Sequence, residues 1–363
     1  MPVPDQRDPQ LTRDLLTGWL SQHLPGVRIP LLKTPTTTGF SSETLIFDAE
    51  WGERREAFVA RVAPIQFQIF PEPRFAEQYR LMRLLDERTD IPVPPIHWYE
   101  PSAEPLGAPF FVMGRIDGDV PTDMPPYHQD GWVTAIPPAE RAAMWWSTLE
   151  IMARLHALDP ADYAFLDQPA YGRTGIGQRL GYYEHYLAWA YPGPQPTATR
   201  ALEWLRAHQP DDGAPEPTAV LWGDARIGNV IFQAGVPRAV LDWETATLGA
   251  PEEDLAWFCY LDRHHSEGVG APRLPGFPTV EETYERYAEL LGRPLRDMFY
   301  YEVLSAFKFA VIMARIGKAF IDYELIPDDS DFPYNNTAST LLARMLDLPD
   351  PGSPPADPFG GQG

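Results

Sequence analysis

Three oxygen-bearing side chains occupy the most informative stretch of the sequence, LWGDARIGNVIFQAGVPRAVLDWE at residues 221–244. Asp224 comes first, Asn229 follows in the same segment, and Asp242 lies near its end. Amide and carboxylate oxygens are ligands that Mg²⁺ prefers, and a loop carboxylate can also accept a proton from a hydroxyl group. The residue types therefore suit a magnesium site beside a proton acceptor.

The elements around these residues are predicted to bring two of them together. Residues 230–232 and 239–241 are apolar and strand-like, and 234–237 carry turn residues, which together predict a β-hairpin. Because the outer ends of a hairpin meet, Asn229 and Asp242 are expected about 5 Å apart. Mg²⁺ takes one or two protein groups and completes its shell with water and phosphate oxygens, so a nucleotide–magnesium site is implied.

Asp224 is the candidate catalytic base. It lies in a loop made tight by Gly223 and Gly228, close enough to accept a proton from a hydroxyl that approaches the same phosphate. Taken alone, a loop Asp is usually a turn or cap residue. Together with Asn229 and Asp242, however, it matches the catalytic and metal-binding parts of protein kinases.

The rest of the chain predicts two unequal lobes. Strand-like runs at 44–47 and 57–62 are separated by a turn at 50–53, a helix is predicted over 75–88, and another strand over 110–113. A first helix is predicted over 11–24, and later helical patterns lie at 139–158, 178–190, 198–208, 280–291 and 299–323. This order predicts an α+β fold with a small antiparallel-sheet lobe, one main helix in it, and a larger, mainly helical lobe.

These patterns set the expected domain boundaries. Residues 1–113 form the N-terminal nucleotide-binding lobe and 114–347 the helical lobe that carries catalysis and the substrate. Residues 348–363 are rich in Pro and Gly and are expected to form a flexible tail.

Composition excludes several classes of protein. Hydrophobic residues make up 44% and aromatic residues 12%, which is enough for a packed core. Fifty-one acidic residues against 29 basic ones give a charge of −22, which argues against a nucleic-acid partner.

The sequence has no signal-like start and no apolar run of ~20 residues, so we expect no membrane contact and a cytoplasmic location. A single cysteine, Cys259, excludes an intramolecular disulfide, and the sequence leaves monomer and homodimer open.

The segment from Trp222 to Glu244 resembles the aminoglycoside phosphotransferase and choline kinase family. The family pattern H-G-D-x-x-x-x-N, followed by I/L-D-W/F-E, stands here as residues 222–229 and 241–244. The next segment, GAPEEDLAWF, resembles the family's G-x-P-x-x-D-L-A, whose Asp, here Asp254, braces the catalytic loop; it also suits a helix cap. LGAPFFVM resembles the hinge strand. The resemblance spans about residues 30–320 and implies a two-lobed protein-kinase-like fold. It is closest to bacterial phosphotransferase-family proteins and to kinase-like domains fused to acyl-CoA dehydrogenases.

The resemblance also implies a nucleotide site in the first lobe. The loop TTTGFSSE would cover the phosphates of ATP or GTP through its backbone and through Gly39, Ser41 and Ser42. It lacks the G-x-G-x-x-G form, and no G-x-x-x-x-G-K-[ST] motif occurs. Adenine would meet backbone groups from Phe111 to Met113, where a strand edge is expected to offer a donor and an acceptor.

Two residues depart from the family pattern. Trp222 replaces the usual His and is expected to pack the loop in the same way. The phosphate-binding lysine of kinases is missing, because none of the three lysines, Lys33, Lys308 and Lys318, lies on the expected strand. Arg61 on that strand is the available cation, with Glu77 on the next helix as its expected partner; alternatively, Arg61 is a surface strand residue.

Other residues that could carry chemistry have simpler structural interpretations. His156 is expected to be a satisfied core histidine, and His264 and His265 are expected in a surface loop. An aromatic group is expected either to pack in the core or to border the acceptor site: Tyr182, Tyr183, Tyr186, Trp189 and Trp204.

Two functions remain open on sequence alone. The first is an ATP- or GTP-dependent phosphotransferase that acts on a hydroxyl of a small molecule, either aminoglycoside-like or of the hydroxyacyl type. The second is a nucleotide-binding, kinase-like regulatory module with little transferase activity, which Arg61 and Trp222 motivate. The intact set of Asp224, Asn229 and Asp242 favours the first.

Overall fold

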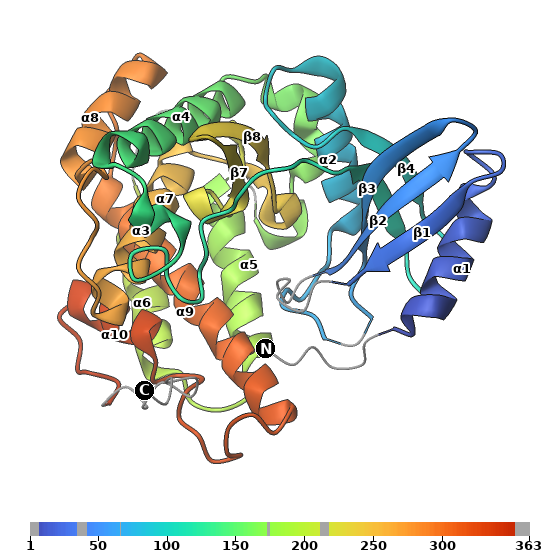
Figure 1. Cartoon of the computed structure of the whole chain (residues 1–363). Helices are drawn as coiled ribbons and strands as arrows, with labels where there is room; N and C mark the ends of the chain where they lie inside the picture. The colour runs from blue at the N-terminus through green and yellow to red at the C-terminus, as the bar shows by residue number, and fades with distance from the viewer. Residues whose placement is uncertain (1–6, 35–41, 66, 173–174, 211–217, 353–363) are drawn as a thin grey trace. The chain divides into compact units, whose positions relative to one another are not determined.

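The computed structural model describes residues 7–34, 42–65, 67–172, 175–210 and 218–352. The chain folds into two compact units, residues 1–117 and 118–363 (Figure 1). The first unit therefore ends four residues after Met113, where the sequence places the end of the first lobe. The nucleotide-loop residues Gly39 and Ser41 and the tail from residue 353 onward lie outside the described residues.

The first unit is built on a five-stranded antiparallel sheet in the order β1-β2-β3-β5-β4. The strands are β1 (Arg28–Lys33), β2 (Glu43–Trp51), β3 (Arg54–Val62), β4 (Ile96–Glu100) and β5 (Phe110–Gly114). The predicted antiparallel pair is confirmed, with Thr44 opposite Arg61 and a two-residue turn in which Gly52 has a φ of 58°. The sequence did not predict the two outer strands, because Pro30 interrupts β1 and a proline-rich run precedes β4.

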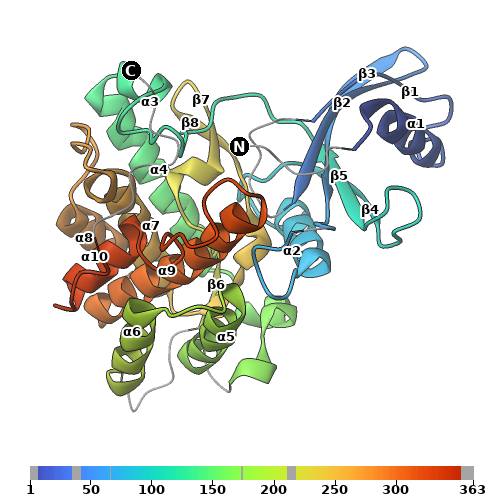
Figure 2. The ribbon, with the colours of Figure 1, turned by 90° about the horizontal axis from the view of Figure 1, so that it is seen from below.

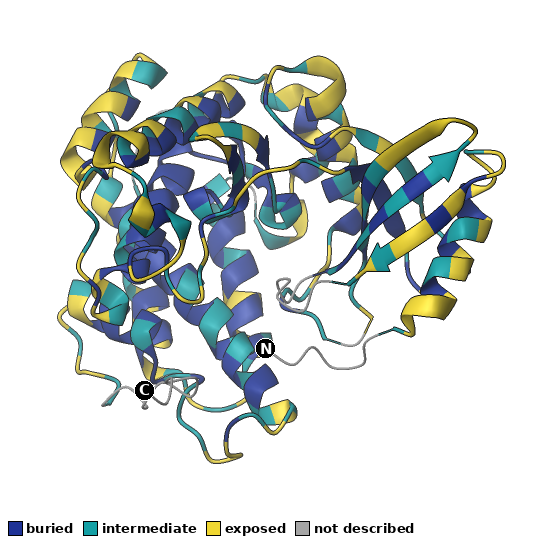
Figure 3. Cartoon of the chain, viewed as in Figure 1, coloured by how far each residue is buried: buried dark blue, intermediate teal, exposed yellow. Residues whose placement is uncertain are grey.

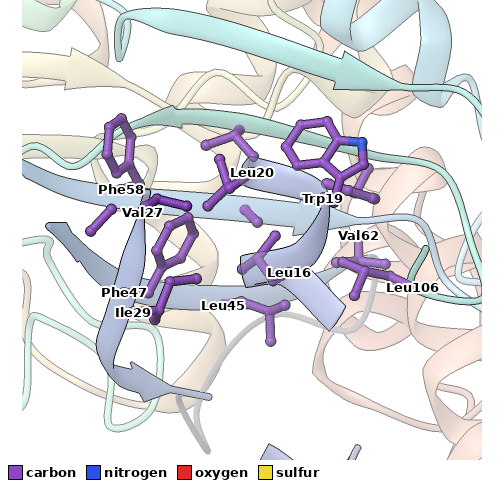
Figure 4. Close-up of a cluster of buried hydrophobic side chains, with 14 of the residues drawn as sticks. Leu16, Trp19, Leu20, Val27, Ile29, Leu45, Phe47, Phe58, Val62 and Leu106 are labelled. Atoms are coloured by element: carbon purple, nitrogen blue, oxygen red, sulfur yellow. The ribbon is translucent and has the colours of Figure 1, made fainter. Parts of the chain in front are cut away.

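A helix covers each face of this sheet. Helix α1 (Pro9–Leu20) buries Leu16 and Trp19 against a cluster of strand side chains that includes Phe58 (Figure 4). Helix α2 (Phe75–Arg88) matches the predicted range and packs on the opposite face, where the ring centroids of Phe75 and Phe111 lie 5.2 Å apart. The alternation of side chains along a strand assigns neighbouring residues of β3 and β5 to these two faces.

The second unit is mainly helical. Its helices are α3 (Trp132–Ala135), α4 (Pro138–His156), α5 (Gly175–Ala190), α6 (Pro196–Ala207), α7 (Pro251–His265), α8 (Val280–Leu291), α9 (Met298–Asp322) and α10 (Thr337–Met345). Short 3₁₀ turns are η1 (Pro160–Leu166), η2 (Pro169–Tyr171), η3 (Ile227–Asn229), η4 (Trp243–Thr245) and η5 (Glu267–Val269). The five helices predicted for this lobe are confirmed as α4, α5, α6, α8 and α9. Helices α9 and α10 lie side by side (Figure 2).

Helix α7 was not among the predicted helical ranges. Fourteen of its fifteen residues are buried, so it has no polar stripe that would reveal a helical period. Helix α8 is the opposite case, since its exposed residues face outward (Figure 3) and its amphipathic pattern is clear in the sequence.

Two small antiparallel pairs complete this unit: β6 (Ala219–Leu221) with β9 (Thr247–Gly249), and β7 (Val230–Gln233) with β8 (Val236–Val240). The second pair is the predicted hairpin. Its turn is shorter than expected, because only Ala234 and Gly235 form it, with φ values of 51° and 75°. Two positive φ values are typical of the tight turns that match the strand twist.

No helix in the described part of the chain has the length and apolar character needed to cross a membrane.

Candidate active site

The catalytic loop brings Asp224 and Asn229 into direct contact. The side-chain Nδ2 of Asn229 donates to the Asp224 main-chain oxygen at 3.0 Å and to its Oδ2 at 2.6 Å. Asn229 is 2% exposed. Because its amide nitrogen is used by Asp224, the amide oxygen Oδ1 is the acceptor that this side chain has for another group.

Asp242 lies at the opposite end of the same hairpin. The main-chain N–H of Leu241 donates to the carbonyl of Asn229 at 2.8 Å, so Asp242 follows directly after the residue paired with Asn229. Asp242 is half-buried, and its φ of 55° and ψ of 60° lie in the left-handed region. This conformation costs free energy for a residue with a side chain and is often found at functional sites. The hairpin thus brings its two ends together as its sequence predicts (Figure 1).

The Asp224 carboxylate receives hydrogen bonds on both oxygens. The indole Nε1 of Trp257 donates to Oδ1 at 2.8 Å, while Nε of Arg226 donates to Oδ2 at 3.2 Å beside Asn229. The side chain of Asp224 is 25% exposed. Three donors therefore hold the plane of this carboxylate while part of it faces solvent.

Asp254 supports the backbone of the catalytic loop. Its side chain is fully buried, and it accepts the main-chain N–H groups of Trp222 at 2.6 Å and Gly223 at 2.9 Å. His156 lies 3.0 Å from the same carboxylate through Nε2, and its Nδ1 contacts the hydroxyl of Tyr287. The prediction that His156 is a satisfied core histidine is confirmed.

Trp222 and Gly223 connect the loop to the exit of the hairpin. The Trp222 indole is 1% exposed, and its Nε1 donates to the Leu241 carbonyl at 2.8 Å. Gly223 has a φ of 88°, and a Cβ at this position would lie 2.2 Å from the Thr245 carbonyl oxygen. Trp222 therefore packs the loop as expected and also ties it to the residue before Asp242.

Arg226 is a site residue that sequence reasoning missed. Its Nη1 lies 2.5 Å from Oδ1 of Asp123, and its Nε contacts Asp224. Burial alone would lower the pKa of Arg226, but the charges of Asp123, Asp224 and Asp242 outweigh it and raise that pKa. The sequence signal that could have identified Arg226 is a cationic residue two positions after Asp224.

Asp123 was also missed, because it belongs to a distant segment. Burial would raise its pKa, but the charges of Arg226 and His265 hold the pKa below the ordinary value. The segment that carries Asp123 is attached to α7 by Asp262. That carboxylate accepts from the Tyr127 hydroxyl at 2.8 Å and contacts His128 Nε2 at 2.9 Å.

The prediction that His264 and His265 lie in a surface loop is wrong. They form the last turn of α7 and are 7% and 8% exposed. The imidazole of His265 lies 3.3 Å from Oδ1 of Asp123. Burial, together with the neighbouring His265, lowers the pKa of His264 to about 3.

The aromatic residues before the catalytic loop divide into two groups. Tyr182, Tyr183 and Tyr186 are buried on α5, so the core-packing reading is confirmed for them. Trp189 and Trp204 are half-buried: Trp189 packs under the guanidinium of Arg315, and Trp204 stacks on His208.

Among the described residues that are predicted to bind the nucleotide, Arg61 and Phe111 lie on the α2 side of the sheet. Arg61 is on β3 opposite Phe111 of β5, and its Nη1 donates to Thr44 Oγ1 at 3.1 Å. Glu77 is in the first turn of α2. Its pairing with Arg61 stays a prediction. Ser42 is buried just before β2.

The expectation of a strand edge at Phe111–Met113 is wrong. Strand β5 lies between β3 and β4, and Phe111 faces Arg61 on one side and Tyr99 on the other. Strand pairing therefore uses the main chain on both sides. The part that Phe111 and Met113 play in nucleotide binding remains a prediction.

The fold is that of the protein-kinase-like phosphotransferases. A solved structure from Ralstonia eutropha, classed provisionally as an aminoglycoside phosphotransferase, superposes with a TM-score of 0.66 at 24% identity, covering 92% of this chain and 95% of that one. A ternary complex of a thermostable aminoglycoside phosphotransferase APH(4)-Ia mutant with ADP and hygromycin B has a TM-score of 0.57 at 16% identity, covering 91% and 98%.

The sequence comparison identifies the family. Residues 38–290 match the phosphotransferase enzyme family, and the chain belongs to it. Rat acyl-CoA dehydrogenase family member 11 is 28% identical over 351 residues, which cover 92% of this chain and 42% of that protein. The chain thus spans less than half the length of this curated relative. The resemblance seen in the sequence is confirmed at the level of the family.

The bracing contacts predict a stability cost for Asp254→Asn. An amide would turn one N–H group toward the main-chain N–H groups of Trp222 and Gly223, which are buried. We expect the free energy of unfolding to fall by about 2–3 kcal/mol in urea titrations. Asp130→Asn is the matched control, because exposed Asp130 also accepts a main-chain N–H, at 2.7 Å. An equal effect of both changes would contradict the prediction.

The burial of His264 predicts a loss of stability in mild acid. Below about pH 6.5 the unfolded chain binds a proton at this residue, but the folded chain does not until about pH 3. Lowering the pH from 7.5 to 5.5 should therefore cost wild type about 1.4 kcal/mol more than His264→Leu. Urea titrations at both pH values measure the difference. The control variant His208→Leu replaces an exposed histidine and should lose as much stability as wild type. An equal loss in His264→Leu would mean that the His264 imidazole is protonated in the folded protein, and would contradict the prediction.

Proposed function

We propose that this chain transfers the γ-phosphoryl group of ATP or GTP to a hydroxyl of a small molecule. The observation that carries the proposal is the arrangement of Asp224 and Asn229 at the entrance of a hairpin whose exit carries Asp242. Membership of the phosphotransferase enzyme family supports the reaction class. Phosphoryl transfer depends mainly on positioning and on charge neutralisation, both of which this arrangement suits.

Asp224 is the proposed acceptor of the hydroxyl proton. Its two oxygens already receive three N–H donors, which fix the orientation of the carboxylate. In a loose transition state the hydroxyl proton leaves late, so little proton transfer is required of Asp224 before the new bond forms. Its principal role is then to orient the hydroxyl toward the phosphorus and to receive the proton as the bond forms.

Asn229 and Asp242 are the proposed protein ligands of Mg²⁺. In the described part of the chain, no group of three or more His, Cys, Asp or Glu side chains could hold a metal. Two hard oxygen donors are nevertheless a fitting set for this ion, which keeps water and phosphate oxygens as its other ligands. Bound there, it would neutralise charge on the nucleotide phosphates. The hydrogen bonds that orient the Asn229 amide leave its oxygen for this purpose.

The proposed nucleotide contacts of the first unit are Arg61, Glu77, Gly39, Ser41, Ser42, Phe111 and Met113. Arg61 would grip phosphate oxygens with its planar guanidinium, and Glu77 would orient it. The aminoglycoside phosphotransferase complex with ADP supports a nucleotide ligand for this fold. We propose a cytoplasmic enzyme, monomeric or homodimeric, that binds neither nucleic acid nor membranes.

A regulatory module with little transferase activity is the second candidate. Arg61 and Trp222 motivate it, because both depart from the family pattern. The contacts of Trp222 weigh against it, since its indole connects the catalytic loop to the hairpin and leaves the site intact. Multiple-turnover phosphoryl transfer from labelled nucleotide separates the two candidates, because both predict nucleotide binding.

The acceptor is proposed to be either aminoglycoside-like or of the hydroxyacyl type. The complex with hygromycin B and the formal charge of −22 favour a cationic acceptor. The similarity to acyl-CoA dehydrogenase family members favours a hydroxyacyl compound. A screen of hydroxylated metabolites and antibiotics with labelled nucleotide would distinguish them.

The role of Asp224 predicts a large loss of turnover on replacement. Asp224→Ala should lower kcat by about 10²-fold or more, because the hydroxyl loses both its orientation and its proton acceptor. Phosphate-transfer assays measure this directly. Asp329→Ala, at an exposed position of the same unit, should keep wild-type turnover. An Asp224→Ala enzyme with normal kcat would remove the assignment of the base.

The role of Arg61 predicts weaker nucleotide binding on replacement. Arg61→Met should raise the nucleotide KM about 10-fold to 10²-fold, since a charge-assisted contact to phosphate contributes about 1.5–3 kcal/mol. Arg61→Lys should retain part of the affinity. Arg54→Met serves as the control, because Arg54 is an exposed arginine on the same strand. An unchanged KM in Arg61→Met would instead favour the reading of Arg61 as a surface strand residue.

A further inference from the structure

Lys308 is a buried lysine close to the candidate active site. It lies on α9 and is 3% exposed, and its Nζ donates to Oε1 of Glu253 at 2.9 Å. The same Nζ lies 4.7 Å from the ring centroid of Trp257 and 5.7 Å from that of Tyr183. Cations at such distances from an aromatic face are attracted by its negative charge distribution.

The cluster around Lys308 holds more positive than negative charge. Oε1 of Glu253 is also contacted by Nε of Arg179 at 2.8 Å, and Arg179 is 6% exposed. Burial would raise the pKa of Glu253, but the charges of Arg179 and Lys308 outweigh it and lower that pKa, so Glu253 is ionised. Two buried cations therefore share one carboxylate beside the face of Trp257.

Trp257 also contacts the candidate base, Asp224. The indole Nε1–H of Trp257 donates to Oδ1 of Asp224 at 2.8 Å. A cation over the ring face draws electron density toward itself and makes the N–H group a better donor. Trp257 is 3% exposed, so water screens this effect little. One indole ring thus joins a buried cation to the carboxylate of the site.

We propose that Lys308 is a positioning residue for Asp224 and acts through Trp257. The inference rests on the proposed function, in which Asp224 receives the hydroxyl proton. Lys308 holds the indole against the carboxylate and strengthens its hydrogen bond to Oδ1. Glu253 in turn holds Lys308 over the ring. Asn229 and Arg226 contact the other oxygen, so the loss of the indole contact would leave the carboxylate free to turn about its bond to Cβ.

The test uses the indole ¹H–¹⁵N resonance of Trp257, which is identified by its loss in Trp257→Phe. In Lys308→Met this resonance should move upfield, in the direction given by Asp224→Ala, because the N–H donates more weakly. Lys308→Arg should restore its position. Lys308→Met leaves Arg179 and Glu253 as a balanced buried pair, so the variant is expected to fold.

The matched control is Lys318→Met on the same helix. Lys318 pairs with Asp322 at the surface and should leave the Trp257 resonance unchanged. A wild-type resonance in Lys308→Met, or an equal shift in Lys318→Met, would overturn the proposal.

Turnover provides the second measurement. Lys308→Met should lower kcat about threefold to tenfold with an unchanged nucleotide KM, and Lys308→Arg should recover most of the loss. A kcat equal to wild type in Lys308→Met would refute the positioning role. If wild type itself transfers no phosphoryl group, the proposed function fails, while the resonance still decides whether Lys308 acts on the contact between Trp257 and Asp224.

Discussion

The candidate site depends on one buried carboxylate. Asp254 is removed from water and holds the main-chain N–H groups of Trp222 and Gly223, which set the path of the chain into Asp224. A buried ionised group is stable only when donors surround it, and here two main-chain groups and His156 supply them. The same hydrogen bonds that stabilise this charge therefore fix the backbone of the catalytic loop.

Helix α7 carries this carboxylate together with the other residues that support the site. Trp257 contacts the candidate base, Asp262 attaches the segment that carries Asp123, and His265 contacts Asp123 itself. Residues at such helical spacings share one side of a helix. Because α7 is buried nearly throughout, it supplies a rigid surface on which segments from distant parts of the sequence meet.

Charge compensation explains why so many ionised groups lie close together here. Arg226 lies among the charges of three aspartates, and Glu253 is shared by two cations. Each group would be costly to bury alone, but paired and hydrogen-bonded groups keep their charges in a low-dielectric interior. The overall charge of the chain says nothing about this local balance. Arg226 and Lys308 each balance buried negative charge, although the protein as a whole is strongly acidic.

The sequence by itself determined the local features: the hairpin between Asn229 and Asp242, the loop that holds Asp224, the amphipathic helices and the family resemblance. These depend on turn residues, short spacings and periodic burial, which neighbouring residues impose on one another. Only the tertiary structure placed Asp123, Trp257 and Lys308 around the site and turned His264 and His265 inward. Their positions depend on contacts between residues far apart in the sequence. Helix α7, which carries Trp257, His264 and His265, is also buried nearly throughout and leaves no periodic signal in the sequence.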